Sequence, residues 1–200
     1  MLAQMVVARL SGSVRGYSMS APASSSASFA SLLRRFARDR DGASALEFAI
    51  VAPFFFGLLF AILETALMFF ASQTLETMTQ ESARMILTGQ AQNDGYKAAD
   101  FKTYVCNQIP AMFSCSNIYV DVQSYSTFSA ITFNNQINPD GSFNSTNLNY
   151  NPGNPGDIVV VRVFYPWQLF VTGLGYNISN MANSQRLLVA TTTFVNEPYN

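Results

Sequence analysis

The sequence predicts an α+β protein in which a long N-terminal helix crosses a membrane, continues as a stem and is followed by a small exterior head. The head is expected to hold an antiparallel sheet of three or more strands. Three observations support this prediction. The thirty residues 43–72 contain two charged side chains, apolar residues keep a helical spacing to about residue 88, and a period of two recurs in short segments of the second half.

The predicted parts are a basic cytoplasmic leader at 1–42, a transmembrane and stem helix at 43–89, and an α+β head at 90–200 with a polar loop at 134–157. The leader carries six Arg and two Asp (+4), whereas residues 43–200 carry five Lys or Arg and ten Asp or Glu (−5). Arginines that directly precede an apolar run remain in the cytoplasm. The expected topology signal consists of Arg34, Arg35, Arg38 and Arg40.

A secretory signal peptide is the alternative interpretation of a basic segment followed by an apolar one. The apolar run is longer than the roughly 7–15 residues of a signal-peptide core, and no small-x-small cleavage site follows it. We therefore favour a membrane anchor with its N-terminus in the cytoplasm and its head outside.

The helix is expected to continue unbroken from Ala43 to Thr88, with Gly89 ending it. Its 46 residues measure about 69 Å at 1.5 Å per residue, which is more than one bilayer requires. Pro53 removes one backbone hydrogen bond, so a local kink or unwound turn is expected there. Glu64 is expected to mark the membrane interface opposite the leader.

In the head, Asp100 is the expected N-cap of a short helix that stops at Pro110. Strands are expected at 118–122, 158–164 and 187–195. Residues 134–157 are rich in Asn, Gly and Pro and are expected to form a long polar loop. The aromatic segment 166–181 is interpreted as irregular, with one helical turn packed on the sheet.

Cys106 and Cys115 are the two cysteines, and both lie on the expected exterior side. A disulfide is the natural interpretation in an oxidising compartment, where closing so short a loop is worth about 2 to 3 kcal/mol. Two buried free thiols are the alternative.

The composition argues against an enzyme. The chain contains no His, which excludes imidazole catalysis and His metal sites, and its lysines, Lys97 and Lys102, lie in a polar connector. No Gly-rich phosphate loop is present, and the acidic main body gives no footprint for nucleic acid. We expect no cofactor, no metal, no small-molecule substrate and no nucleic-acid partner.

Glu47 is the unusual residue of the apolar helix. An unpaired carboxylate inside a bilayer costs about 2.5 to 3.5 kcal/mol, so such a residue is a functional candidate. Taken alone, Glu47 is equally compatible with a position at the interface, where a carboxylate is cheap.

The sequence around Glu47 favours the functional interpretation. The basic stretch ends in Gly42, and the following residues read Ala43-Ser44-Ala45-Leu46-Glu47-Phe48-Ala49-Ile50-Val51-Ala52-Pro53. This segment resembles the processing motif of type IV pilin-like proteins and, more narrowly, the start of the TadE-like pseudopilins of the tight adherence (Flp) pilus system. Asn196-Glu197-Pro198-Tyr199 and Tyr165-Pro166-Trp167 are similar to further features of that family.

The resemblance implies cleavage by a prepilin peptidase between Gly42 and Ala43, with Glu47 and Phe48 completing the processing and assembly motif. It also implies a pilin-like fold, a single-pass location in the bacterial inner membrane, and a periplasmic head that can be incorporated into extracellular pili. The implied partners are the peptidase, other pilin and pseudopilin subunits, the assembly platform and membrane lipid. Major Flp pilins are much shorter, so the chain is expected to be a minor subunit.

An uncleaved, signal-anchored periplasmic scaffold is the alternative function, with the arginines serving as a topology signal alone. The sequence leaves open whether translation starts at Met1 or Met19 and whether the mature N-terminus is methylated. It also leaves open the partner of the head.

Overall fold

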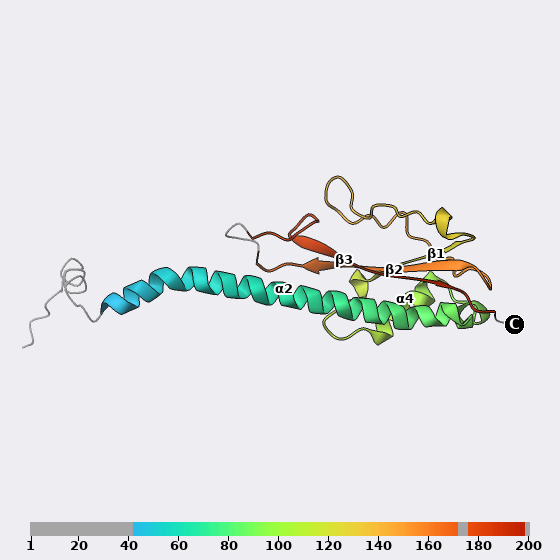
Figure 1. Ribbon diagram of the computed structural model, residues 1–200, viewed down its shortest axis with the longest axis horizontal. Helices are drawn as coiled ribbons and strands as arrows, with labels where there is room; N and C mark the ends of the chain where they lie inside the picture. The colour runs from blue at the N-terminus through green and yellow to red at the C-terminus, as the bar shows by residue number, and fades with distance from the viewer. Residues whose placement is uncertain (1–41, 172–175, 199–200) are drawn as a thin grey trace, which may run out of the picture. The chain divides into compact units, whose positions relative to one another are not determined.

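The computed structural model describes residues 42–171 and 176–198. Its elements, in chain order, are α2 (Ala43–Leu87), α3 (Gln90–Asn93), α4 (Ala98–Gln108), the 3-10 turn η2 (Cys115–Asn117), β1 (Tyr119–Tyr125), the 3-10 turn η3 (Phe128–Ala130), β2 (Ile158–Gln168) and β3 (Gln185–Val195). A long apolar helix followed by a small antiparallel sheet confirms the predicted α+β class (Figure 1). The part of α2 from Ile50 onward belongs to one compact unit with the head, and the first turns of the helix belong to another.

The sheet is a three-stranded antiparallel meander with β2 in the centre. β2 is buried over its first eight residues, which explains why its sequence is a continuous apolar run instead of an alternating one. β1 pairs with β2 only as far as Phe164, so Pro166 lies where β2 has one neighbour and no N–H is needed on its other side. β2 therefore continues through Pro166 and Trp167, beyond the strand predicted from sequence.

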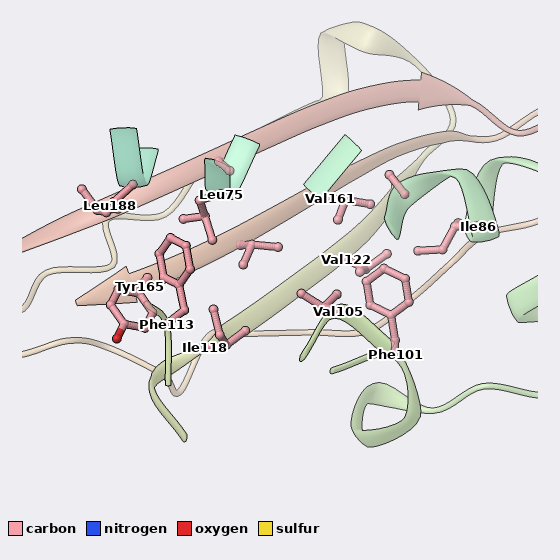
Figure 2. Packing of buried hydrophobic residues seen from close by; sticks show 14 of the residues in the cluster. Leu75, Ile86, Phe101, Val105, Phe113, Ile118, Val122, Val161, Tyr165 and Leu188 are labelled. Atoms are coloured by element: carbon pink, nitrogen blue, oxygen red, sulfur yellow. The ribbon is translucent and has the colours of Figure 1, made fainter. Parts of the chain in front are cut away.

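The core lies between the helices and one face of the sheet. The second half of α2 contributes Leu75 and Ile86, and α4 contributes Phe101 and Val105. Figure 2 shows these side chains converging with apolar residues of β1 and β2, among them Val122. Burying an aliphatic side chain of this size is worth about 1.5 to 3 kcal/mol, so this face holds the head on the helix.

The opposite face of the sheet is covered by the loop between β1 and β2 (Figure 1). Phe143 of this loop packs on Tyr119 and Phe164, with ring centroids 4.4 and 5.7 Å away. Turns within the loop are fixed locally: the Ser142 hydroxyl and N–H both donate to Asp140, which holds the pKa of that carboxyl below its usual value. The predicted polar loop is therefore the second layer of the head.

A buried ion pair joins β1 and β2 on the loop-covered face. Asp121 and Arg162 are directly opposite in the strand register, and Nη2 of Arg162 lies 2.7 Å from Oδ2 of Asp121. The second carboxylate oxygen accepts from the backbone N–H of Asn149 at 2.8 Å, and the guanidinium stacks between Phe133 and Phe164 at 5.1 and 5.2 Å. Both charges are thus compensated, which is the condition for burying an ion pair without large cost.

The end of α2 is tied to the end of the sheet. Gly89 adopts a positive φ of 75°, as expected for a glycine that terminates a helix. The carbonyl of Leu87, one of those left unpaired at a helix end, accepts the backbone N–H of Glu197 at 2.9 Å. Asn196, which is buried, donates its side-chain amide to the carbonyls of Pro152 and Asn154.

The structure contains a disulfide between Cys106 of α4 and Cys115, with 5.5 Å between their Cα atoms. The two-thiol alternative is therefore wrong. The bridge closes the loop that carries Phe113, whose ring packs against Tyr165 and Trp167 at 5.0 and 6.1 Å. The disulfide thus holds Phe113 against the aromatic side chains at the end of β2. We call Phe113, Tyr165 and Trp167 the aromatic plug.

Two local predictions are wrong. Asp100 does not precede α4 but lies in its first turn, where its carboxylate accepts the backbone N–H of Lys97 at 2.9 Å. The helical turn expected within 166–181 is absent from the described residues of that segment, because β2 extends to Gln168 and an irregular stretch follows.

Tyr150 gives a test of the packing between loop and core. Its hydroxyl is buried and has no hydrogen-bond partner among the described residues. The centroids of the Tyr150 and Phe101 rings are 5.7 Å apart. Burial, followed by the charge of Asp100, raises the pKa of Tyr150 to about 12. The unfolded chain ionises this group near pH 10, so its contribution to stability is complete below pH 10 and is lost as the pH rises through 12.

We expect Tyr150→Phe to change the free energy of unfolding at pH 7 by less than about 1 kcal/mol, because no hydrogen bond is lost. Above pH 10, the variant should lose less stability than the wild type. Chemical unfolding of the full chain in detergent at pH 7 and pH 11 measures both quantities. Tyr125→Phe is the control and should retain the wild-type decline; an equal decline in Tyr150→Phe would contradict the assignment.

Candidate assembly and anchoring helix

The start of α2 presents its side chains outward. Gly42 directly precedes the helix, and a Cβ added there would meet no described atom within 4 Å. The residues from Ser44 to Ile50 are exposed, Glu47 and Phe48 among them. Within the described part of the chain, no group bonds to the Glu47 carboxylate. Among the described residues, none covers this surface of the helix start.

The four arginines of the topology signal lie outside the described residues, as does the rest of the leader. The side chain of Ala43 is likewise not described. The structure thus leaves both the orientation in the membrane and the expected cleavage point as predictions.

The next part of α2 is apolar on every side that the head leaves free. Among the described residues, one helix is long and apolar enough to cross a membrane, and its most apolar 18-residue window has a mean hydropathy of 2.3. Its exposed large apolar residues include Leu46, Phe48, Ile50, Val51, Phe54, Phe55, Phe56, Leu58, Phe60, Ile62, Leu63, Leu67, Phe69 and Phe70. Helical structure continues through Pro53, so the expected unwound turn is not present.

Glu64 has a partner that the sequence analysis missed. Its side chain is 5% exposed, and its carboxylate accepts the backbone N–H groups of Phe170 and Val171, the latter at 3.0 Å. The hydroxyl of the next residue, Thr65, bonds to the Tyr176 hydroxyl, which also donates to the carbonyl of Ala61 at 3.4 Å. We call this group of contacts the Glu64 clamp.

The Glu64 clamp changes the interpretation of that residue. Glu64 was expected to mark the membrane interface opposite the leader, and in the structure the backbone after β2 supplies its hydrogen bonds. A carboxylate that accepts backbone N–H groups is satisfied away from water. The sequence signal was the stretch 167–178, which contains no charged residue between two strands and so was suited to an apolar location.

The C-terminal motifs singled out from sequence have structural roles. Tyr165 and Trp167 belong to the aromatic plug behind the disulfide, and the Tyr165 hydroxyl accepts the backbone N–H of Ser114 at 3.3 Å. Glu197 bonds the end of the sheet to the end of α2, and Asn196 bonds to the loop that precedes β2. These contacts explain the motifs by packing and hydrogen bonding alone.

No cluster of three or more potential metal ligands occurs among the described residues. The buried charges within that same part of the chain, Asp121, Arg162 and Glu64, each have protein partners. The described residues place an exposed carboxylate at the start of an apolar helix and a head on the second half of that helix.

These features are consistent with one class of protein, the membrane-anchored pilin-like proteins: the described residues form one helix that is long and apolar enough to span a membrane, followed by a small antiparallel sheet. More narrowly, residues 42–84 match the family model described as TadE-like protein, which confirms the predicted resemblance over that segment. The match covers the helix and stops before the head, and it agrees with a pilin-like, structural component associated with the Tad pilus. No curated protein and no solved structure matches the chain significantly.

The Glu64 clamp makes a local prediction. Glu64→Ala should increase amide hydrogen exchange at Phe170 and Val171 by about tenfold or more, because bonds to a charged acceptor are worth roughly 1.5 to 3 kcal/mol each. Mass spectrometry of the full chain in detergent micelles resolves the peptide that carries both amides. Glu76→Ala, which removes an exposed carboxylate three turns along the helix, is the control and should leave that peptide unchanged. Unaltered exchange in Glu64→Ala would show that the clamp is not formed.

Proposed function

We propose that this protein is a minor pilin-like subunit of a tight adherence (Flp) pilus, matured by removal of its leader and used in pilus assembly for surface attachment and biofilm formation. The observation that carries the proposal is the TadE-like match, which begins at Gly42, the residue before the expected cut. The exposed helix start and the absence of any described partner for Glu47 support it.

In this proposal, a prepilin peptidase cuts between Gly42 and Ala43 on the cytoplasmic side of the inner membrane. Arg34, Arg35, Arg38 and Arg40 hold the leader in the cytoplasm and place the head in the periplasm. Small residues on both sides of the bond suit a protease, which must draw its substrate into an extended conformation. Cleavage removes the +4 leader and leaves Glu47 as the fifth residue of the mature chain.

The new α-amine of Ala43 is largely protonated near neutral pH, since its reference pKa is about 7.7 to 8.0. An ammonium group on one subunit and the Glu47 carboxylate of its neighbour neutralise each other in the apolar bundle, which offsets the burial cost of both. This pairing sets the axial stagger between subunits, with Phe48 and the other exposed apolar residues supplying the contact surface. The partners are other pilin and pseudopilin subunits and the assembly platform.

The first test is the intact mass and N-terminal sequence of the full chain extracted from membranes of cells with and without the prepilin peptidase. We expect a mature chain that begins Ala43-Ser44-Ala45 only when the peptidase is present. Gly42→Val should block this cleavage while leaving the head folded, because a Cβ at Gly42 meets no described atom within 4 Å.

A chain that keeps residues 34–42 in both strains would contradict the proposal. That result would identify an uncleaved, signal-anchored envelope scaffold, in which the arginines act as a topology signal alone. Normal folding of the head in all samples, checked by its disulfide, separates a cleavage defect from misfolding.

The second test concerns Glu47. Glu47→Ala should insert and be cleaved like the wild type but fail to co-purify with other pilus subunits, because a neighbour's α-amine is left without a counter-charge. Ser44→Ala alters an exposed residue of the same helix start and should assemble normally. Piliation and subunit recovery in sheared surface fractions measure assembly, and normal assembly of Glu47→Ala would refute the pairing.

A further inference from the structure

The residues that follow β2, Leu169–Val171, are fastened to α2 at the level of Glu64, and we call them the turn. Leu169 is buried, whereas the side chain of Phe170 is 81% exposed although its backbone N–H is bound to the Glu64 carboxylate. Further along the chain, Tyr176 bonds to Thr65 and Ala61. The turn therefore has a fixed height along the helix and directs one large aromatic side chain outward.

At this same height the free surface of α2 is still apolar. Leu63, just before Glu64, is 49% exposed, and Leu67 and Phe70, just after it, are 53% and 61% exposed. The next charged residue is Glu76. The helical stretch from Ile50 to Phe70 spans about 30 Å at 1.5 Å per residue, which equals the thickness of a bilayer's hydrocarbon core. Lipid that covers the exposed helix therefore reaches the level of the turn.

The composition of the turn fits that location. Residues 169–178 contain no charged side chain and include Phe170 and Tyr176. Tyrosine is enriched where a protein passes from hydrocarbon to water. The backbone N–H groups that such a turn would otherwise expose to lipid are bound at Phe170 and Val171 by Glu64, which removes the main cost of placing irregular backbone there.

We propose that the turn at Leu169–Val171 is a second membrane contact, which inserts Phe170 into the leaflet on the head's side while the Glu64 clamp holds it against the transmembrane helix. The occupant of this exposed surface is lipid, because the surface continues the lipid-facing side of α2 without a break. The head then rests on the bilayer and does not stand above it on a bare stem. This inference requires α2 to span the membrane and is independent of leader cleavage.

The test uses tryptophan fluorescence of the full chain in vesicles of phosphatidylcholine with brominated acyl chains. Trp167 is the single tryptophan of the sequence, so Trp167→Phe provides a silent background. In that background, Phe170→Trp reports on the turn. Phe128→Trp is the negative control: this residue is also exposed, but it follows β1 at the end of the sheet where Tyr125 pairs with Ile158, opposite the end that carries the turn. Phe60→Trp, on the exposed apolar part of α2, is the positive control.

We expect brominated lipid to reduce the fluorescence of Phe170→Trp and Phe60→Trp relative to unbrominated lipid, and to leave Phe128→Trp unchanged. Quenching of Phe60→Trp without quenching of Phe170→Trp would overturn the proposal. So would a Phe170→Trp fluorescence that changes with the protein density in the vesicle and not with bromination, because that result indicates that a second copy of the chain covers the turn. No quenching of Phe60→Trp would also overturn it, because the helix would then not be in the bilayer.

Because Trp167 packs in the aromatic plug, Trp167→Phe alters the packing of the head. The same fluorescence comparison is therefore repeated in chains that keep Trp167. There, subtraction of the wild-type signal isolates the added tryptophan. A peptidase-deficient strain supplies chains with the leader intact, and quenching of Phe170→Trp in these chains separates the membrane contact from the proposed maturation.

Discussion

The structure depends on the packing of one helix against two different environments. The first part of α2 is apolar around its exposed surface and needs lipid or other helices, whereas its second part buries Leu75 and Ile86 against the sheet. The described part of the head has three strands, too few to enclose a core of their own, and this helix supplies the missing layer. Membrane anchoring and folding of the head therefore rely on the same continuous element.

Burial in this chain follows from how each polar group is partnered. Asp121 and Arg162 are buried as a pair with additional donors, and Glu64 is buried with two backbone amides. Glu47 differs from all three, because it is exposed and no described group bonds to it. The family match covers this residue and ends within α2, so the part of the chain that distinguishes it from a bare pilin helix is the head.

Periodicity was a good guide to the elements and a poor guide to their ends. The alternation of Ile118, Val120 and Val122 indicated β1 because these side chains pack in the core, but β2 is buried on both faces and passes through a proline that only its position in the sheet permits. The role of Arg162 was not predictable, since its partner Asp121 lies 41 residues earlier and is brought opposite it only by the strand register. Glu64 was undervalued for the same reason: its donors are backbone groups more than 100 residues away.

The sheet is attached to α2 at two separated points, the Glu64 clamp at one end and the bond from Glu197 to the Leu87 carbonyl at the other. Between these points the helix and the sheet run side by side (Figure 1), and the sheet supports the helix. A force that stretches α2 is shared with the strands. It loads the hydrogen bonds of the two attachments in shear, so that these bonds must break together. This part of the helix therefore resists stretching and bending that a bare membrane helix of the same sequence would not.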